Sequence, residues 1–160
     1  MAARDLIILV RHAHRDLSDP EMDNGLSAKG RKQARALAKC LKDRLEKKEK
    51  VVLFSSPKRR CLETLEPLAR YFGRRLQYSD LLLEQQAGET QTAFQARVTR
   101  GVREISTLQK SGAVILVCSH GDWLPIALRR LCGVKVELKK AGFAEIENGQ
   151  LVRLLQSSDF

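Results

Sequence analysis

The sequence predicts an α/β fold in which a mostly parallel central sheet lies between two helical layers and ends in an antiparallel hairpin. Short, wholly apolar runs alternate with segments of helical periodicity, a pattern typical of parallel strands covered by helices on both faces. Near the end of the chain, Asn148-Gly149 separates two strand-like segments, which favours a hairpin. The 160 residues suffice for one hydrophobic core, so we expect a single domain over residues 1–160, folded as a three-layer α/β/α sandwich.

The first half of the chain predicts two strand–helix units. Residues 6–10 (LIILV) form an apolar, β-branched run that we expect in the middle of the sheet. Ser27 is a suitable N-cap for a helix that ends within residues 46–50. Residues 51–54 (VVLF) predict the second buried strand. Ser55-Ser56-Pro57 then indicates a cap and a first-turn proline for a helix that runs to about Phe72.

The second half predicts a third strand at residues 75–79 and a long helix from about residue 90 to residue 109, closed by Gly112. The inward positions expected on this helix are Phe94, Val98, Val102 and Ile105. Residues 113–118 (AVILVC) predict a further buried strand, followed by a helix through Leu131 that Gly133 terminates. Residues 142–147 and 150–155 are the expected strands of the hairpin.

Charge and composition limit the partners and the compartment. Lys and Arg outnumber Asp and Glu by 29 to 19, which favours anionic partners such as phosphates. No aromatic residue lies among the lysines of residues 29–50, so we do not expect nucleic acid as a partner. The four cysteines form no CxxC pair and indicate buried free thiols in a reducing compartment. The N-terminal apolar run is too short for a signal peptide or a membrane span, so we expect a cytoplasmic protein without membrane contact.

Polar residues follow three of the predicted strands at their carboxyl ends. Arg11-His12 follows the first strand, Ser55-Ser56 with Arg59 and Arg60 follows the second, and Ser119-His120 follows the strand at residues 113–118. In open parallel sheets, ligands bind at this edge. Arginines that converge there can hold phosphate oxygens in a bidentate manner, so the pattern indicates an anion site. Taken singly, each histidine is better interpreted as an ordinary, partly buried polar residue, and only their convergence with the arginines favours the anion site.

A metal site built from His12, His14 and His120 is the alternative to the anion site. Residues two apart on an extended segment point the same way, which would allow two of these histidines to share a metal. Arg11 and Arg15 flank the pair, however, and their charges would oppose a divalent cation. We therefore expect no metal and no cofactor.

These motifs resemble those of the histidine phosphatase superfamily, the phosphoglycerate-mutase-like group. Leu9-Val10-Arg11-His12-Ala13 matches its first signature, and Val117-Cys118-Ser119-His120-Gly121 is similar to its second histidine motif. Further similar segments lie between them in the family's order: residues 26–34, residues 55–60 with Thr64, and residues 88–90 with Arg97-Val98. The resemblance covers most of the chain and implies the same α/β/α fold.

The resemblance implies a metal-independent phosphatase that works through a covalent phosphohistidine. His12 would be the nucleophile, and Arg11, Arg60 and His120 would bind the phosphoryl group. We choose Arg60 rather than Arg59 because it lies four residues after Ser56, as the family arginine does after its serine. Ser18 and His14 are further candidates for substrate contact, with a smaller expected loss on mutation of His14 than of His12.

The leaving group needs a proton, which the family usually takes from a carboxylate in the segment after the third strand. Glu84 is the candidate donor, and Glu89 is the alternative, although a glutamate in a first helical turn is also simply favoured by the helix dipole. Three positions depart from the family pattern: Ala13 replaces a glycine, Ser18 an asparagine and Leu62 an arginine.

The departures and the short chain make this sequence more similar to the small bacterial phosphohistidine phosphatases than to the mutases. The expected substrate is a protein phosphohistidine or a small phosphate monoester, with the former favoured by size alone. Two alternatives stay open: a phosphoryl transferase of the phosphoglycerate-mutase type, and a non-catalytic module that binds phosphate or phosphoproteins. The sequence does not predict the oligomeric state.

Overall fold

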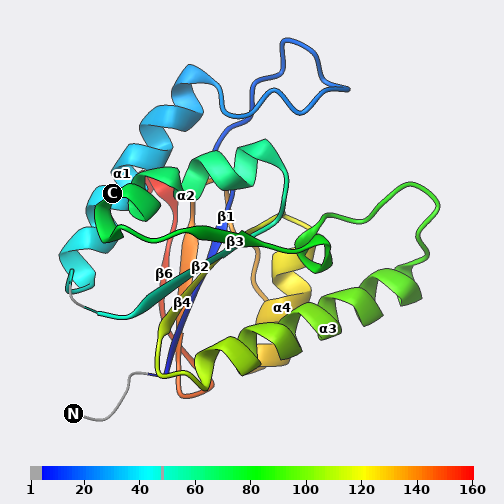
Figure 1. Cartoon of the computed structure of the whole chain (residues 1–160). Coiled ribbons are helices and arrows are strands. Elements are labelled where there is room, and N and C mark those ends of the chain that lie inside the picture. The colour runs from blue at the N-terminus through cyan, green and yellow to red at the C-terminus, as the bar shows by residue number, and fades with distance from the viewer. Residues whose placement is uncertain (1–4, 48) are drawn as a thin grey trace.

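A six-stranded sheet forms the centre of the computed structural model, which describes residues 5–47 and 49–160 (Figure 1). Its strands are β1 (Leu6–Arg11), β2 (Val51–Ser55), β3 (Leu76–Tyr78), β4 (Val114–Ser119), β5 (Phe143–Glu147) and β6 (Gln150–Leu155), in the order β3-β2-β4-β1-β5-β6. The pairs β1–β4, β2–β4 and β2–β3 are parallel, whereas β5 is antiparallel to β1 and to β6. The mostly parallel sheet with a C-terminal hairpin is therefore confirmed.

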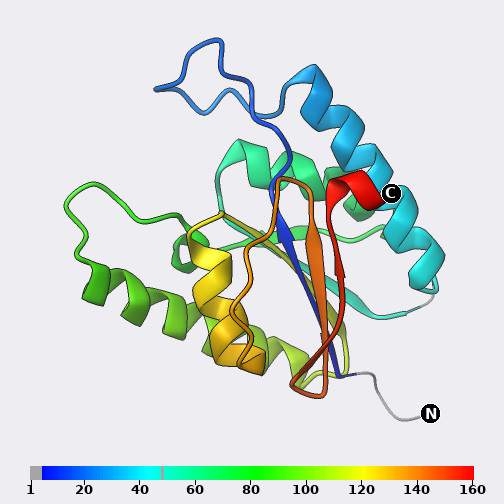
Figure 2. The same ribbon diagram turned by 180° about the vertical axis from the view of Figure 1, so that it is seen from behind.

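Helices cover both faces of the sheet. On one face α1 (Ala28–Arg44) and α2 (Arg59–Phe72) pack on Leu6, Ile8 and Val10, and on the other face α3 (Gln91–Gln109) and α4 (Trp123–Cys132) pack on Ile7 and Leu9. Figure 2, from the opposite side, shows the β5–β6 hairpin in front, with α1 and α2 on one side of the sheet and α3 and α4 on the other. Because neighbouring strand residues point to opposite faces, a strand between two helical layers must be apolar throughout. The three-layer sandwich predicted from this pattern is confirmed.

Most predicted elements lie within one or two residues of the observed ones, and two boundaries differ. The Oγ of Ser27 accepts a hydrogen bond from the backbone N–H of Gly30 at 3.0 Å and caps α1, as expected. This helix ends at Arg44, before the predicted range of residues 46–50, in which Lys48 lies outside the described residues.

The start of α2 also differs from the prediction. This helix begins at Arg59, and its N-cap residue Lys58 makes no side-chain capping bond. The expected cap and first-turn proline at Ser55-Ser56-Pro57 are wrong, because Ser55 ends β2 and the Oγ of Ser56 instead contacts the His120 ring. At the other end of α2, Gly73 adopts the left-handed conformation and closes the helix.

The hairpin turn agrees with the prediction, and the burial of the cysteines agrees in part. Asn148 and Gly149 both have positive φ angles, 52° and 75°, as a two-residue turn between β5 and β6 requires. All four cysteines are free, but Cys61 and Cys118 alone among them are fully buried, so the expectation of buried thiols holds for two of the four. No helix in the described part of the chain is long and apolar enough to cross a membrane.

The sheet register brings three strand ends together. Arg11 at the end of β1 pairs with Ser119 at the end of β4, and Ser55 at the end of β2 pairs with Cys118. The polar residues that follow these strands therefore meet at one edge, where ligands of open parallel sheets bind.

Candidate active site

A cavity of about 520 Å³ opens at this edge of the sheet. Its lining residues are Arg11, His12, Arg15, Arg60, Glu84, His120, Gly121, Asp122, Glu137 and Lys140. The structure thus brings together all five residues expected to carry the chemistry, from the ends of β1 and β4, the first turn of α2 and the segment after β3.

His12 lies directly after β1 and is held by the backbone. Its N–H donates to the carbonyl of Ser119 at 3.2 Å, and its Nδ1 lies 2.8 Å from the carbonyl oxygen of Ala13. Since a carbonyl only accepts, we assign the proton to Nδ1, which leaves the lone pair on Nε2. Burial, with the nearby charges of His120 and Arg60, lowers the pKa of His12 to about 3. The imidazole is therefore neutral at physiological pH and can act as a nucleophile.

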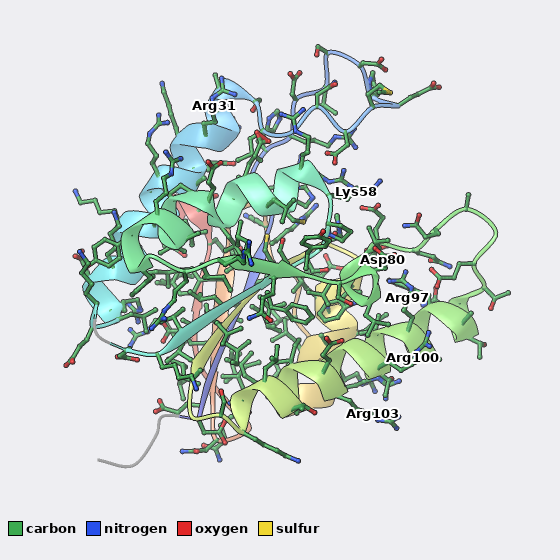
Figure 3. The ribbon with its side chains drawn as sticks, in the orientation of Figure 1. Arg31, Lys58, Asp80, Arg97, Arg100 and Arg103 are labelled. Carbon is green, nitrogen blue, oxygen red and sulfur yellow. The ribbon has the colours of Figure 1, made fainter. Side chains whose placement is uncertain are left out.

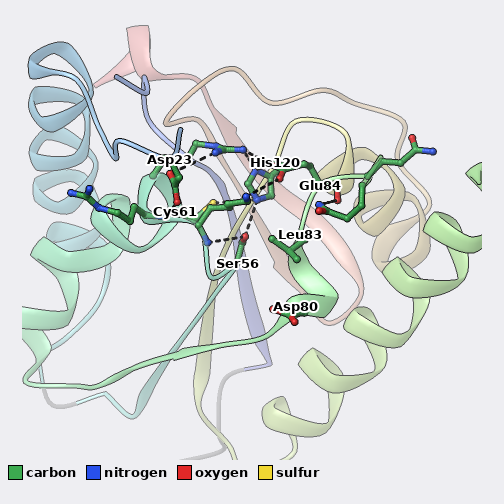
Figure 4. Close-up of polar contacts among 12 residues, drawn as sticks. Asp23, Ser56, Cys61, Asp80, Leu83, Glu84 and His120 are labelled. Atoms are coloured by element: carbon green, nitrogen blue, oxygen red, sulfur yellow. Dashed lines mark hydrogen bonds and ion pairs between the residues drawn. The ribbon is translucent and has the colours of Figure 1, made fainter. Parts of the chain in front are cut away.

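His120 follows β4 and has the opposite character. Its Nδ1 lies 2.8 Å from an Oε2 oxygen of Glu84, and its Nε2 lies 2.8 Å from the Oγ of Ser56 (Figure 4). The Sγ of Cys61 is 3.7 Å from the same Nε2. Burial by itself would lower the pKa of His120, but the contacts with Cys61 and Glu84 raise it to about 9. This histidine is a buried cation whose ring centroid lies 5.4 Å from that of His12.

Two arginines add positive charge next to the histidines. Nη1 of Arg11 donates to the carbonyl of Leu138 at 2.9 Å, and Nη2 of Arg60 donates to Glu84. The Nε atoms of both arginines are buried and have no hydrogen-bond partner among the described residues. A Cβ on Gly121 would lie 2.7 Å from the Cζ of Arg11, so the glycine allows the guanidinium to approach the backbone. Buried, unpaired N–H groups carry a free-energy cost that a bound oxyanion would remove.

Glu84 lies among these cations, whereas Glu89 does not. Burial opposes ionisation of Glu84, but the hydrogen bond with His120 and the charges of His120 and Arg60 lower its pKa to about 2. Glu89 does not line the cavity and instead accepts hydrogen bonds from Nε and Nη2 of Arg97, both at 2.8 Å. Of the two glutamates that the sequence left as alternatives, the geometry favours Glu84.

Ser18 and His14 are not brought into the cavity. The side chain of Ser18 is exposed, and its backbone N–H donates to an Asp16 oxygen at 2.9 Å. The Nδ1 of His14 lies 2.7 Å from the Oγ of Ser27, at the start of α1. Neither residue lines the cavity, although Arg15, which lies between them in the chain, does.

Sequence reasoning missed several residues of the site. Cys61 contacts the ring of His120, as does Ser56, which the sequence placed at this edge without a stated role, and Asp23 lies 3.7 Å from Nη1 of Arg60. Arg15 and Lys140 line the cavity. The sequence positions of Asp23, Cys61 and Lys140 carry no signal, because each reaches the site through a loop or a helix turn whose path depends on tertiary contacts. Among the described residues, no group of three or more His, Cys, Asp or Glu side chains is arranged to hold a metal ion.

The sequence profile of the histidine phosphatase superfamily (branch 1) matches residues 7–92 and 81–159. The chain belongs to this superfamily. No curated protein matches the sequence.

Several solved phosphatase structures share the fold of this chain at low sequence identity. A mycobacterial glucosyl-3-phosphoglycerate phosphatase is 17% identical, with a TM-score of 0.70 over 95% of this chain and 97% of that chain. The proposed phosphohistidine phosphatase SixA of Agrobacterium tumefaciens is 19% identical, with a TM-score of 0.73 over 94% and 96%. A phosphoserine phosphatase of Entamoeba histolytica is 16% identical, with a TM-score of 0.72 over 93% and 95%.

Proposed function

We propose that this protein is a phosphatase that forms a covalent phosphohistidine on His12. One observation carries the proposal: Nδ1 of His12 lies 2.8 Å from the Ala13 carbonyl oxygen, which assigns the ring proton to Nδ1 and leaves the lone pair on Nε2, in a cavity that Arg11 and Arg60 also line. A histidine with a pKa of about 3 does not need a base to remove its proton before it attacks. A residue that only had to bind phosphate would serve better as a cation.

Arg11, Arg60 and His120 hold the phosphoryl group in this proposal. Phosphoryl transfer needs little covalent chemistry from the protein beyond the nucleophile, because most of the barrier is lowered by positioning and by charge on the equatorial oxygens. The two guanidinium groups and the imidazolium supply three positive charges in the lining of the cavity. The unpartnered Nε atoms of both arginines are consistent with this role.

Glu84 serves as the proton carrier. Without substrate it is an anion that pairs with Arg60 and His120. A bound phosphate competes for the same two cations and adds negative charge beside the carboxylate, so the pKa of Glu84 rises in the complex and it takes the proton that a monoanionic ester brings.

The reaction then has two balanced steps. Nε2 of His12 attacks phosphorus, the ester P–O bond breaks, and the leaving oxygen takes its electron pair and the Glu84 proton. Water next attacks the phosphohistidine and gives a proton to Glu84, the P–N bond breaks, and inorganic phosphate leaves. Neither step uses a metal ion.

The proposed substrate is a phosphate monoester or a protein phosphohistidine. The three similar structures include proteins described as acting on phosphohistidine, phosphoserine and glucosyl-3-phosphoglycerate. All three descriptions are phosphatases, which supports hydrolysis over a mutase reaction that retains the phosphoryl group.

Hydrolysis of para-nitrophenyl phosphate by wild type, His12→Ala and His14→Ala tests the proposal. We expect His12→Ala to lower kcat/KM by more than about a thousandfold, because the nucleophile is lost. His14→Ala is the matched control, since its ring lies against Ser27 outside the cavity lining, and it should lose less than about tenfold. Equal activity of wild type and His12→Ala would refute the nucleophile, and loss of activity with a chelator would refute metal independence.

A further inference from the structure

We propose that the cavity contains a second anion subsite, formed by Arg15 and Lys140, which binds a carboxylate or a second phosphate group of the substrate. Both residues line the same cavity as His12, and neither belongs to the phosphoryl clamp. The inference rests on the proposed function, because it assigns a substrate class to that same site.

Lys140 is held beside the phosphoryl clamp by its neighbours in the chain. The N–H of Ala141 donates to the carbonyls of Arg11 at 3.0 Å and of His12 at 3.2 Å, and the N–H of Arg11 donates to the carbonyl of Gly142 at 3.0 Å. Ala141 has a φ of 63°, a left-handed conformation that a residue with a Cβ keeps only where its surroundings fix it. The backbone on both sides of Arg11-His12 therefore fixes the position from which Lys140 reaches the cavity.

Arg15 is held by the loop that follows His12. Its Nη2 donates to the carbonyls of Pro20 at 2.9 Å and of Met22 at 3.1 Å, and its backbone pairs with Leu26. No hydrogen bond within the described residues uses its Nε or Nη1. An arginine anchored through one nitrogen keeps the others free for an anion and loses little side-chain entropy on binding.

The charges of the two residues are not neutralised. Within residues 5–47 and 49–160, neither Arg15 nor Lys140 forms an ion pair, whereas Arg60 and Lys58 both pair with Glu84. Burial and the repulsion from Arg11, Lys29 and Arg15 lower the pKa of Lys140. An anion between these groups would relieve that repulsion.

The three carboxylates that line the cavity do not neutralise Arg15 or Lys140. Glu84 is engaged by the clamp, and Asp122 accepts the backbone N–H of Gln85 at 3.0 Å. Glu137 also lines the cavity, but it forms no ion pair with either cation within the described residues. With the phosphoryl group on Arg11, Arg60 and His120, Arg15 and Lys140 remain for another anionic group of the same molecule. The structure thus assigns a doubly anionic substrate.

Binding of non-hydrolysable phosphonates tests the subsite without requiring turnover. Calorimetry would compare meta-carboxyphenylphosphonate and meta-phosphonophenylphosphonate with meta-carbamoylphenylphosphonate, which has a similar shape but no second charge. We expect wild type to bind at least one charged probe about tenfold more tightly than the neutral probe, as one charge-assisted contact provides. Whichever charged probe is favoured distinguishes a carboxylate from a phosphate.

Substitutions of Arg15 and Lys140 test whether these two residues cause the tighter binding of the charged probes. Lys140→Met and Arg15→Met should bring the ratio of dissociation constants close to one, and Lys140→Glu should invert it. Lys139→Met is the matched control, because Lys139 is exposed and does not line the cavity, and it should keep the wild-type ratio. An unchanged ratio in Lys140→Met and Arg15→Met, or no preference in wild type, would overturn the subsite. A protein that shows the preference but hydrolyses no aryl phosphate would support the subsite and refute the phosphatase.

Discussion

Two buried histidines at one edge of the sheet have opposite protonation states because their partners differ. Burial and the nearby charges of His120, Arg60 and Arg11 keep His12 neutral despite its hydrogen bond to the Ala13 carbonyl, whereas the contacts with Glu84 and Cys61 keep His120 charged despite its burial. Different environments shift the pKa values of the two histidines in opposite directions. Two identical side chains can therefore have different roles. In the proposed mechanism the neutral ring attacks and the charged ring binds the phosphate.

The pKa of His120 predicts a pH dependence. Because its folded-state pKa is raised to about 9, His120 is cationic below that pH, and kcat/KM for para-nitrophenyl phosphate should fall as the pH rises through about 9. Glu84→Gln removes a charge that raises this pKa, so the decline should move to lower pH. The para-nitrophenolate leaving group needs little protonation, so the loss of the Glu84 proton carrier in Glu84→Gln does not obscure the pH profile of kcat/KM.

The control for this profile is Glu66→Gln, which removes a carboxylate on the exposed side of α2, where it pairs with Arg70. Its decline should stay near the wild-type pH. An identical profile for wild type and Glu84→Gln would show that Glu84 does not set the charge of His120.

At the scale of the elements, hydrogen bonds from α3 hold the segment that carries Glu84 in position. Arg97, on the inner side of this helix, donates to both carboxylate oxygens of Glu89. It also donates to the carbonyls of Asp80, Leu81, Leu83 and Glu84 at 2.7 to 3.2 Å. Figure 3 shows Arg97 beside Asp80, with Arg100 and Arg103 farther along α3. One side chain therefore holds the backbone up to and including the proposed proton carrier, and also binds the carboxylate of Glu89 beyond it.

Arg97→Met should act through the position of Glu84. A shift of about 1 Å in a catalytic group can cost roughly a hundredfold in rate. We expect a loss of that order for phenyl phosphate, whose leaving group needs a proton, and a much smaller loss for para-nitrophenyl phosphate. Measured kcat values for the two substrates separate this role from a general loss of stability, which would lower both rates equally.

Arg100→Met is the matched control, since Arg100 follows Arg97 by three residues, just under one helical turn, but is exposed. It should leave the ratio of the two rates unchanged. An equal loss for both substrates in Arg97→Met would refute a positioning role.

The elements also show what the sequence could and could not predict. The apolar runs in β1 and β4 and the Asn148-Gly149 turn depend on local patterns, so their structures follow from the sequence. The start of α2 does not, because the Oγ of Ser56 bonds to a ring 64 residues away instead of capping the helix. Helix-capping patterns depend only on neighbouring residues, so they do not include a competing partner that is distant in the sequence.

At the scale of the whole molecule, the site exists only because the sheet order places β1 between β4 and β5 and β4 next to β2. Arg11, His12, Arg60 and His120 could be expected together because each follows or lies near the end of a predicted strand. Lys140 could not, because its place depends on the bonds from Ala141 to Arg11 and His12. The single-domain organisation and the cytoplasmic location stay predictions.

The central claim is the phosphohistidine on His12, and its direct detection is the decisive measurement. The protein would be mixed with an aryl phosphate, quenched in alkali, in which phosphohistidine survives, and analysed by peptide mass spectrometry. We predict one acid-labile phosphoryl group on the peptide that contains His12, absent from His12→Gln and retained in His14→Gln. Turnover without any labelled His12 peptide, or a phosphoryl group on another residue, would contradict the account.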